Sequence, residues 1–113
     1  ACRLAEETPG LKLTLDTGHL LCSGHVQDGW DRLFPHVAHV HVKDAGLTRD
    51  YYQVPYGEGS LDVNRLVRSL VAVKYGGFLS IEYTGSRRDD VVRFDPVPEI
   101  VKLRAAIQSA ALT

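Results

Sequence analysis

Hydrophobic and polar residues alternate in three short stretches of the chain. Residues 11–16, LKLTLD, carry a leucine at every second position and a polar side chain between leucines. Residues 37–43, VAHVHVK, and residues 78–83, FLSIEY, show much the same period of two. This period is typical of a β-strand, because successive side chains of a strand point to opposite faces of its sheet. The pattern predicts three strands, each with an apolar and a polar face.

Residues 60–75 show the longer period of a helix. Apolar side chains recur there at intervals of three and four residues, as on the buried stripe of an amphipathic helix. The stripe consists of Leu66, Val67, Leu70 and Val71. Ser60 is predicted to cap the N-terminus, because its hydroxyl can accept a hydrogen bond from a free N–H group of the first turn. Gly76 and Gly77 are predicted to end the helix.

Three further helical segments are expected. Residues 3–9 have the pattern of a helix end that stops at the TPG sequence, and residues 29–37 contain a brief amphipathic helix that Pro35 stops. Residues 97–111 are predicted to form a last helix that begins at Pro98. Strands and helices therefore alternate along the chain, which predicts parallel strands joined by right-handed crossovers.

The polar faces of the strands distinguish two α/β folds. The polar face of each strand carries Asp16, His41 or Glu82 toward its C-terminal end. Strands of a doubly wound sheet are covered by helices on both faces and are apolar on both. In a (β/α) barrel, by contrast, inward-facing residues at the C-terminal rim line the active site. The pattern favours a barrel.

In such a barrel, Asp16, His41 and Glu82 are expected at one level of the rim and to converge on one point. One imidazole and two carboxylates form a ligand set suited to Mn, Mg, Co, Fe or Zn. The chain has no paired thiolates of the kind that hold structural zinc. Hydrogen-bonded polar residues at strand ends are the alternative to a metal site, and spacing alone leaves both open.

Composition and charge exclude several classes of protein. The formal net charge is -1, and the chain has no basic stripe of the kind that follows a phosphate backbone, so no nucleic acid partner is expected. The apolar runs are far shorter than the ~20 residues that cross a bilayer, so no membrane association is expected. Two cysteines are too few for a disulfide scaffold, which makes the cytoplasm the default location.

Four motifs occur in order along the chain, namely LDTGH, HVHVKD, GEGSLD and GFLSIEY. Together they resemble the C-terminal part of the xylose-isomerase-like TIM-barrel superfamily. This superfamily includes sugar-phosphate isomerases and epimerases, hydroxypyruvate isomerase, inosose dehydratase and the AP endonuclease family 2 members. The resemblance covers essentially the whole chain. It implies that residues 1–113 form a partial (β/α)8 TIM barrel, of the α/β class, with about the last three strand–helix units.

The resemblance also implies a metal site. In the superfamily, a Glu, an Asp, a His and a second Glu from successive strands hold one divalent metal ion. Asp16, His41 and Glu82 match the last three of these ligands, and the ion is expected to be Mn, Mg, Co or Zn. The first Glu belongs to the fifth strand, which this chain does not contain. Glu82 is also the candidate catalytic base.

Four more residues are predicted to contact a carbohydrate substrate. His19 resembles the histidine of the superfamily's D-x-x-H motif, which contacts the substrate or is a second ligand. Lys43 would add positive charge near the reacting oxygens, with a solvated or ion-paired lysine as the alternative. Arg49 suits an anionic group of the substrate. Tyr52 lies on the loop after the second strand, where barrel enzymes keep their specificity residues, although packing of the loop onto the rim is the alternative.

The reaction implied by the resemblance is isomerisation or epimerisation of a small ketose or hydroxy-ketone through an enediolate, with the metal as Lewis acid and a carboxylate as base. Dehydration of a cyclic polyol, as by inosose dehydratase, needs the same metal and base and stays open. A non-catalytic barrel fragment also stays open. AP endonuclease activity is disfavoured, because the loop TRDYYQVPYGEG lacks histidine and the chain lacks a basic stripe.

The chain is expected to be the C-terminal piece of a longer enzyme. Complete barrels of this kind have ~250 residues. Three strands would leave two open edges of a parallel sheet and an uncovered polar face. We therefore expect self-association, or a companion segment that completes the barrel. Without the first Glu, the isolated chain is expected to bind divalent metal weakly and to show little turnover.

Overall fold

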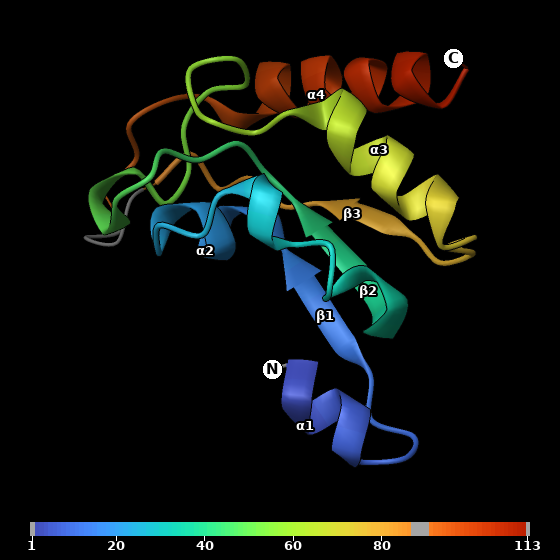
Figure 1. Cartoon of the computed structure of the whole chain (residues 1–113). Helices are drawn as coiled ribbons and strands as arrows, with labels where there is room; N and C mark the ends of the chain where they lie inside the picture. Colours follow the sequence, from blue (N-terminus) through green and yellow to red (C-terminus); the bar gives the residue numbers. More distant parts are fainter. Residues whose placement is uncertain (1, 87–90, 113) are drawn as a thin grey trace.

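A sheet of three parallel strands forms the centre of the chain in a computed structural model, which describes residues 2–86 and 91–112 (Figure 1). The strands are β1 (Leu13–Asp16), β2 (Val37–Val42) and β3 (Leu79–Ile81). β2 is central, and it pairs in parallel with β1 on one side and with β3 on the other. The predicted parallel α/β arrangement is therefore confirmed, with each strand shorter than its predicted range.

Helices precede, separate and follow the strands. The α-helices are α1 (Cys2–Glu7), α2 (Thr17–Cys22), α3 (Val63–Ala72) and α4 (Pro96–Ala111). Short 3-10 helices are η1 (Gln27–Gly29), η2 (Phe34–His36) and η3 (Arg49–Tyr51). Figure 1 shows α3 and α4 packed together on one side of the sheet. No helix in the described part of the chain is both long and apolar enough to span a membrane.

The core lies between the sheet and these two helices. Leu15, Val40 and Val42 of the strands are buried, as the alternating pattern predicts. Leu66 of α3 and Leu103 of α4 are also fully buried and belong to the same apolar cluster. Burial of apolar surface between sheet and helices is the main stabilising contribution to such a layer.

The opposite face of the sheet is polar. Thr14 is exposed, and His39 and Ser80 are only partly buried. The His39 ring lies at 3.3 Å from the Ser80 hydroxyl and packs edge-on against the His41 ring. This face is the inner wall that the alternating pattern predicts for a barrel.

The start of α3 differs from the prediction. Asp62 caps the helix by accepting a hydrogen bond from the Arg65 N–H, so the helix begins two residues after the predicted boundary. Ser60 instead donates its backbone N–H to the carbonyl of Ala45, which holds it in the loop. Asp62 is the better cap, because its negative charge also interacts favourably with the helix dipole.

The end of α3 also differs. The helix ends at Ala72, before the two glycines, and Lys74 adopts the left-handed conformation with a φ of 55°. The Lys74 N–H bonds to the carbonyl of Val71, and the Tyr75 N–H bonds to that of Leu70. This pair of bonds is the Schellman motif, and here a lysine occupies the position that glycine usually takes. Val71 is exposed, so its predicted place in the buried stripe is wrong.

Two predictions that relied on proline are wrong in detail. α4 begins at Pro96 rather than Pro98, because the Asp95 side chain accepts a hydrogen bond from the Val97 N–H and caps the helix there. Pro35 lies within the 3-10 helix η2 and does not stop an amphipathic α-helix. Proline fits the first turn of either helix type, because the N–H that it lacks would have no partner in that turn.

Candidate metal site

Asp16, His41 and Glu82 come together at the C-terminal ends of the three strands. The sheet register pairs Asp16 with His41, and the Glu82 N–H bonds to the carbonyl of Val42. One ligand atom from each of the three side chains lies within 4.8 Å of the others. The structure therefore brings together the three residues that the strand pattern singles out.

Close polar contacts connect the three side chains. His41 Nδ1 lies 2.6 Å from Glu82 Oε2 and 3.9 Å from Asp16 Oδ2. Asp16 Oδ1 accepts a hydrogen bond from the His19 N–H and so caps α2, which leaves Oδ2 directed at the cluster. The cap fixes the orientation of the Asp16 carboxylate, because both of its oxygens are engaged.

Lys43 forms ion pairs with two carboxylates of the cluster. Its ammonium Nζ lies 3.4 Å from Asp16 Oδ2 and 3.2 Å from Glu82 Oε1, and its side chain is 0% exposed. The stem of Lys43 passes so close to Gly18 that a Cβ on this glycine would lie 2.4 Å from Lys43 Cε. The lysine is therefore ion-paired and buried, and its predicted contact with a substrate stays a prediction.

The charge of Lys43 influences the acidity of Glu82. Partial burial alone would raise the pKa of the Glu82 carboxyl. The hydrogen bond and charge of Lys43, with a smaller contribution from His41, outweigh burial and hold this pKa below its ordinary value. Glu82 is therefore a carboxylate at neutral pH.

The remaining predicted site residues lie at different distances from the cluster. The ring of Tyr52 packs over Lys43, with its centroid 5.0 Å from Nζ, and lies 5.6 Å from the His19 ring. His19 is exposed, and its Nε2 lies 4.0 Å from Asp16 Oδ2. Arg49 is on the exposed helix η3, and in the described part of the chain no hydrogen bond or ion pair connects it to the cluster.

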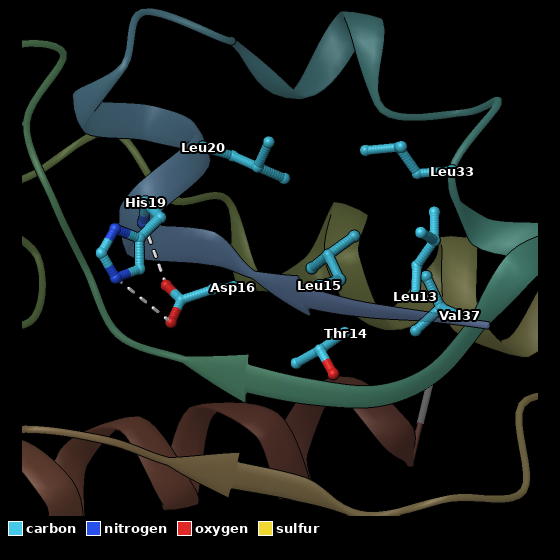
Figure 2. A pocket seen from close by; sticks show the side chains of 8 residues that line it. All are labelled: Leu13, Thr14, Leu15, Asp16, His19, Leu20, Leu33 and Val37. Carbon is cyan, nitrogen blue, oxygen red and sulfur yellow. Dashed lines mark hydrogen bonds and ion pairs between the residues drawn. The ribbon is translucent and has the colours of Figure 1, made fainter. Parts of the chain in front are cut away.

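A separate apolar pocket of about 180 Å³ lies along β1. Figure 2 shows Asp16 and His19 at one end of this pocket, with leucines along the rest of it. Neither His41 nor Glu82 lines it. The pocket is therefore next to the polar cluster and does not open over it.

Sequence patterns missed the residues that hold the surrounding loops. The buried Asp44 carboxylate accepts four backbone N–H groups, two on each oxygen, from Ala45, Gly57, Gly59 and Leu61. The Tyr83 hydroxyl accepts the Asp44 N–H and donates to the carbonyl of Val54, and burial raises its pKa well above the ordinary range. The HVHVKD motif contains Asp44, but strand alternation does not show what lies opposite its carboxylate.

The donor set of the cluster fits a divalent cation. Carboxylate oxygens and an imidazole nitrogen are ligands that Mn, Mg, Co and Zn accept, in different proportions. Separations of up to 4.8 Å between ligand atoms require only small side-chain movements for all three to reach ~2 Å from one ion. The three residues can therefore hold a metal ion, together with ligands from elsewhere.

Comparison with known families agrees with this geometry. The model of the xylose isomerase-like TIM barrel family matches residues 1–109. The chain belongs to this family. The three parallel strands are thus part of a (β/α) barrel, and the rim cluster lies where barrels of this kind keep their active sites.

Two individual proteins show how much of a family member the chain represents. The C-glycoside deglycosidase alpha subunit of Arthrobacter globiformis is 31% identical over 87 residues, which cover 72% of this chain and 23% of that protein. The structure of a xylose isomerase domain protein from Alicyclobacillus acidocaldarius covers 93% of this chain and 38% of its own, with a TM-score of 0.61 and 19% identity. At this identity the structural likeness shows the fold alone. The chain spans well under half the length of both proteins.

Proposed function

We propose that the chain supplies most of the metal site of a sugar isomerase or epimerase that acts on a small ketose or hydroxy-ketone. The observation that carries this proposal is the convergence of Asp16, His41 and Glu82 at the C-terminal rim of three parallel strands. Membership of the xylose isomerase-like family supports it, because the same three residues match the motifs of the family's metal ligands.

Different residues of the chain have different roles in the proposed reaction. A bound divalent ion supplies Lewis-acid stabilisation of the negative charge that develops on substrate oxygens. Asp16 and His41 would hold the ion. Glu82, ionised at neutral pH, is both a ligand and the group that accepts the proton from the carbon next to the carbonyl. His19 and Tyr52 form the wall beside the cluster and contact the sugar, and Arg49 on the following loop meets an anionic group when the substrate has one.

The proposed site needs a fourth ligand. Within the described residues, the cluster consists of three potential ligands. We propose that the missing Glu comes from a companion segment that supplies the preceding strands. Such a segment would pair with the β1 edge and complete the ligand set.

A second candidate is cleavage of a C-glycoside. The likeness to the C-glycoside deglycosidase alpha subunit favours it. Dehydration of a cyclic polyol would use the same ion and the same base. These reactions differ in their products, and so they are distinguished by assay.

Metal binding is the first test of the proposal. Isothermal titration of the purified chain with Mn²⁺ should show weak binding, and His41→Ala, which removes the imidazole ligand, should abolish it. His25→Ala is the matched control, because His25 is an exposed loop residue away from the cluster. Submicromolar Mn²⁺ binding that survives His41→Ala would rule out this site.

The reaction is tested by incubating the chain with Mn²⁺ and a panel of ketoses in deuterated water. Isomerisation or epimerisation through proton transfer should place deuterium on the carbon next to the carbonyl, whereas C-glycoside cleavage releases the aglycone. Little turnover is expected from the chain alone, and more when a segment that carries the missing Glu is added. Deuterium incorporation that is unaffected by Glu82→Gln would contradict the role of Glu82.

A further inference from the structure

We propose that Lys43 is an internal counter-ion, whose ammonium group holds Asp16 and Glu82 together when no metal is bound and competes with the metal for the same oxygens. This inference deepens the proposed metal-dependent function and rests on it. It concerns a residue of this chain, and its consequences are measurable without catalytic turnover.

The first support is the position of the ammonium group. Lys43 Nζ lies 3.4 Å from Asp16 Oδ2 and 3.2 Å from Glu82 Oε1, and so bridges carboxylates from the two outer strands of the sheet. Asp16 Oδ2 also lies 3.9 Å from His41 Nδ1. The ammonium and a metal ion ligated by these side chains would therefore share at least one oxygen.

The second support is that the position of Lys43 is built into the fold. The Thr17 hydroxyl accepts a hydrogen bond from the Lys43 N–H and donates one to its carbonyl oxygen, and both groups are buried. Gly18 leaves the space through which the lysine stem passes. The face of the Tyr52 ring covers the ammonium from the other side, as in a cation–π contact. A lysine held at so many points is not a solvated surface charge.

The third support is the charge balance of the cluster. Two carboxylates this close repel each other, and removal of the cation between them leaves the mostly buried Asp16 carboxylate without its main partner. A divalent ion satisfies the same two carboxylates but is repelled by an ammonium a few ångströms away. Lys43 should therefore stabilise the metal-free chain and weaken metal binding, which are effects of opposite sign.

Lys43→Met separates these two effects, because methionine keeps an unbranched apolar stem of similar length and removes the charge. We expect the melting temperature of the metal-free chain to fall by about 4 °C. We expect the affinity for Mn²⁺, measured by isothermal titration, to rise about tenfold once the repulsion is gone. The rise in melting temperature on adding Mn²⁺ should be larger for this variant than for the parent chain.

Lys102→Met is the matched control. Lys102 also pairs with a carboxylate, that of Glu99, but it is largely exposed and lies on α4. This variant should change neither the Mn²⁺ affinity nor, by more than a small amount, the melting temperature. If Lys43→Met instead weakens Mn²⁺ binding or leaves it unchanged, Lys43 does not compete with the metal and the inference is wrong.

These measurements distinguish a failure of the counter-ion role from a failure of the proposed metal site. If His41→Ala abolishes Mn²⁺ binding and Lys43→Met fails to strengthen it, the metal site stands and the counter-ion role falls. If the parent chain and Lys43→Met both bind no Mn²⁺, or bind it independently of His41, the proposed metal site falls and the counter-ion inference falls with it.

Discussion

Because Gly18 has no side chain, the stem of Lys43 can pass it and reach the cluster. Its Cα faces the stem of Lys43, and a Cβ would lie 2.4 Å from Cε and 2.7 Å from Cγ of the lysine. The second of these atoms is close to the backbone and cannot move far. The absence of a side chain at residue 18 is therefore a steric requirement of the buried lysine.

Gly18→Ala should consequently destabilise the chain, although alanine is the better helix former. Displacement of the Lys43 stem should lower the free energy of unfolding by about 1–3 kcal/mol, as measured by urea denaturation. Gly29→Ala is the control, since a Cβ at Gly29 meets no atom within 4 Å and its φ is not positive. Equal stability of the two variants would show that the stem of Lys43 moves aside freely.

At the scale of single residues, the candidate site residues could be predicted where they fitted the alternating pattern of a strand. Asp16, His41 and Glu82 stand out in the sequence because each is polar toward the end of an alternating stretch. The burial of Lys43 was not predictable, because it depends on the empty space at Gly18, which belongs to another element. Alternation assigns a side chain to a face and does not show what the neighbouring strand places opposite.

The loop from β2 to α3 depends on one buried carboxylate. Asp44 follows β2, and each of its oxygens accepts two backbone N–H groups of the loop and of the segment before α3. A carboxylate can accept all of these bonds, because both of its oxygens are acceptors. Asp44 thereby connects the strand that carries His41 with the segment that leads into the covering helix.

Asp44→Asn should destabilise the chain strongly while preserving the shape of the side chain. An amide has one oxygen and one NH2 group, so in either orientation two of the backbone N–H groups lose their acceptor. We expect a loss of about 2 kcal/mol or more in urea denaturation. Asp50→Asn is the matched control in the same loop, where the side chain is exposed, and should have little effect. Equal losses in both variants would argue against the special role of Asp44.

At the scale of elements, the types and the order were predictable, and several boundaries were not. Each strand lies inside its predicted stretch, because the period of two is a direct consequence of strand geometry. The ends of α3 could not be predicted, because more than one nearby residue could cap or end the helix. Asp62 caps the helix instead of Ser60, and Lys74 adopts the left-handed conformation before the glycines are reached.

For the molecule as a whole, the sheet has two outer strands, and its polar face is only partly covered. β1 and β3 each pair with one strand among the described residues. The Phe78 side chain, just before β3, is 82% exposed. Open edges and exposed aromatic residues favour association with another chain.

Light scattering of the purified chain should therefore give a mass above the 12.5 kDa of one copy. The association should bury residues at the edges of the sheet. Phe78→Asp should therefore shift the population toward smaller species, because it places a charge in the apolar contact. Val71→Asp, on the exposed side of α3, is the control for a new charge elsewhere. A monodisperse monomer for the parent chain would contradict the expected association.

The hydrogen bonds that Asp44 accepts limit the part of the loop after β2 that can vary in sequence. Residues 47–51 form an exposed tip, whereas the stem on either side is bound to the Asp44 main chain and carboxylate. The tip can therefore be replaced while its two points of attachment and the cluster of Asp16, His41 and Glu82 stay unchanged. Substitutions in the tip should therefore change the proposed substrate contact of Arg49 and leave the proposed metal ligands in place.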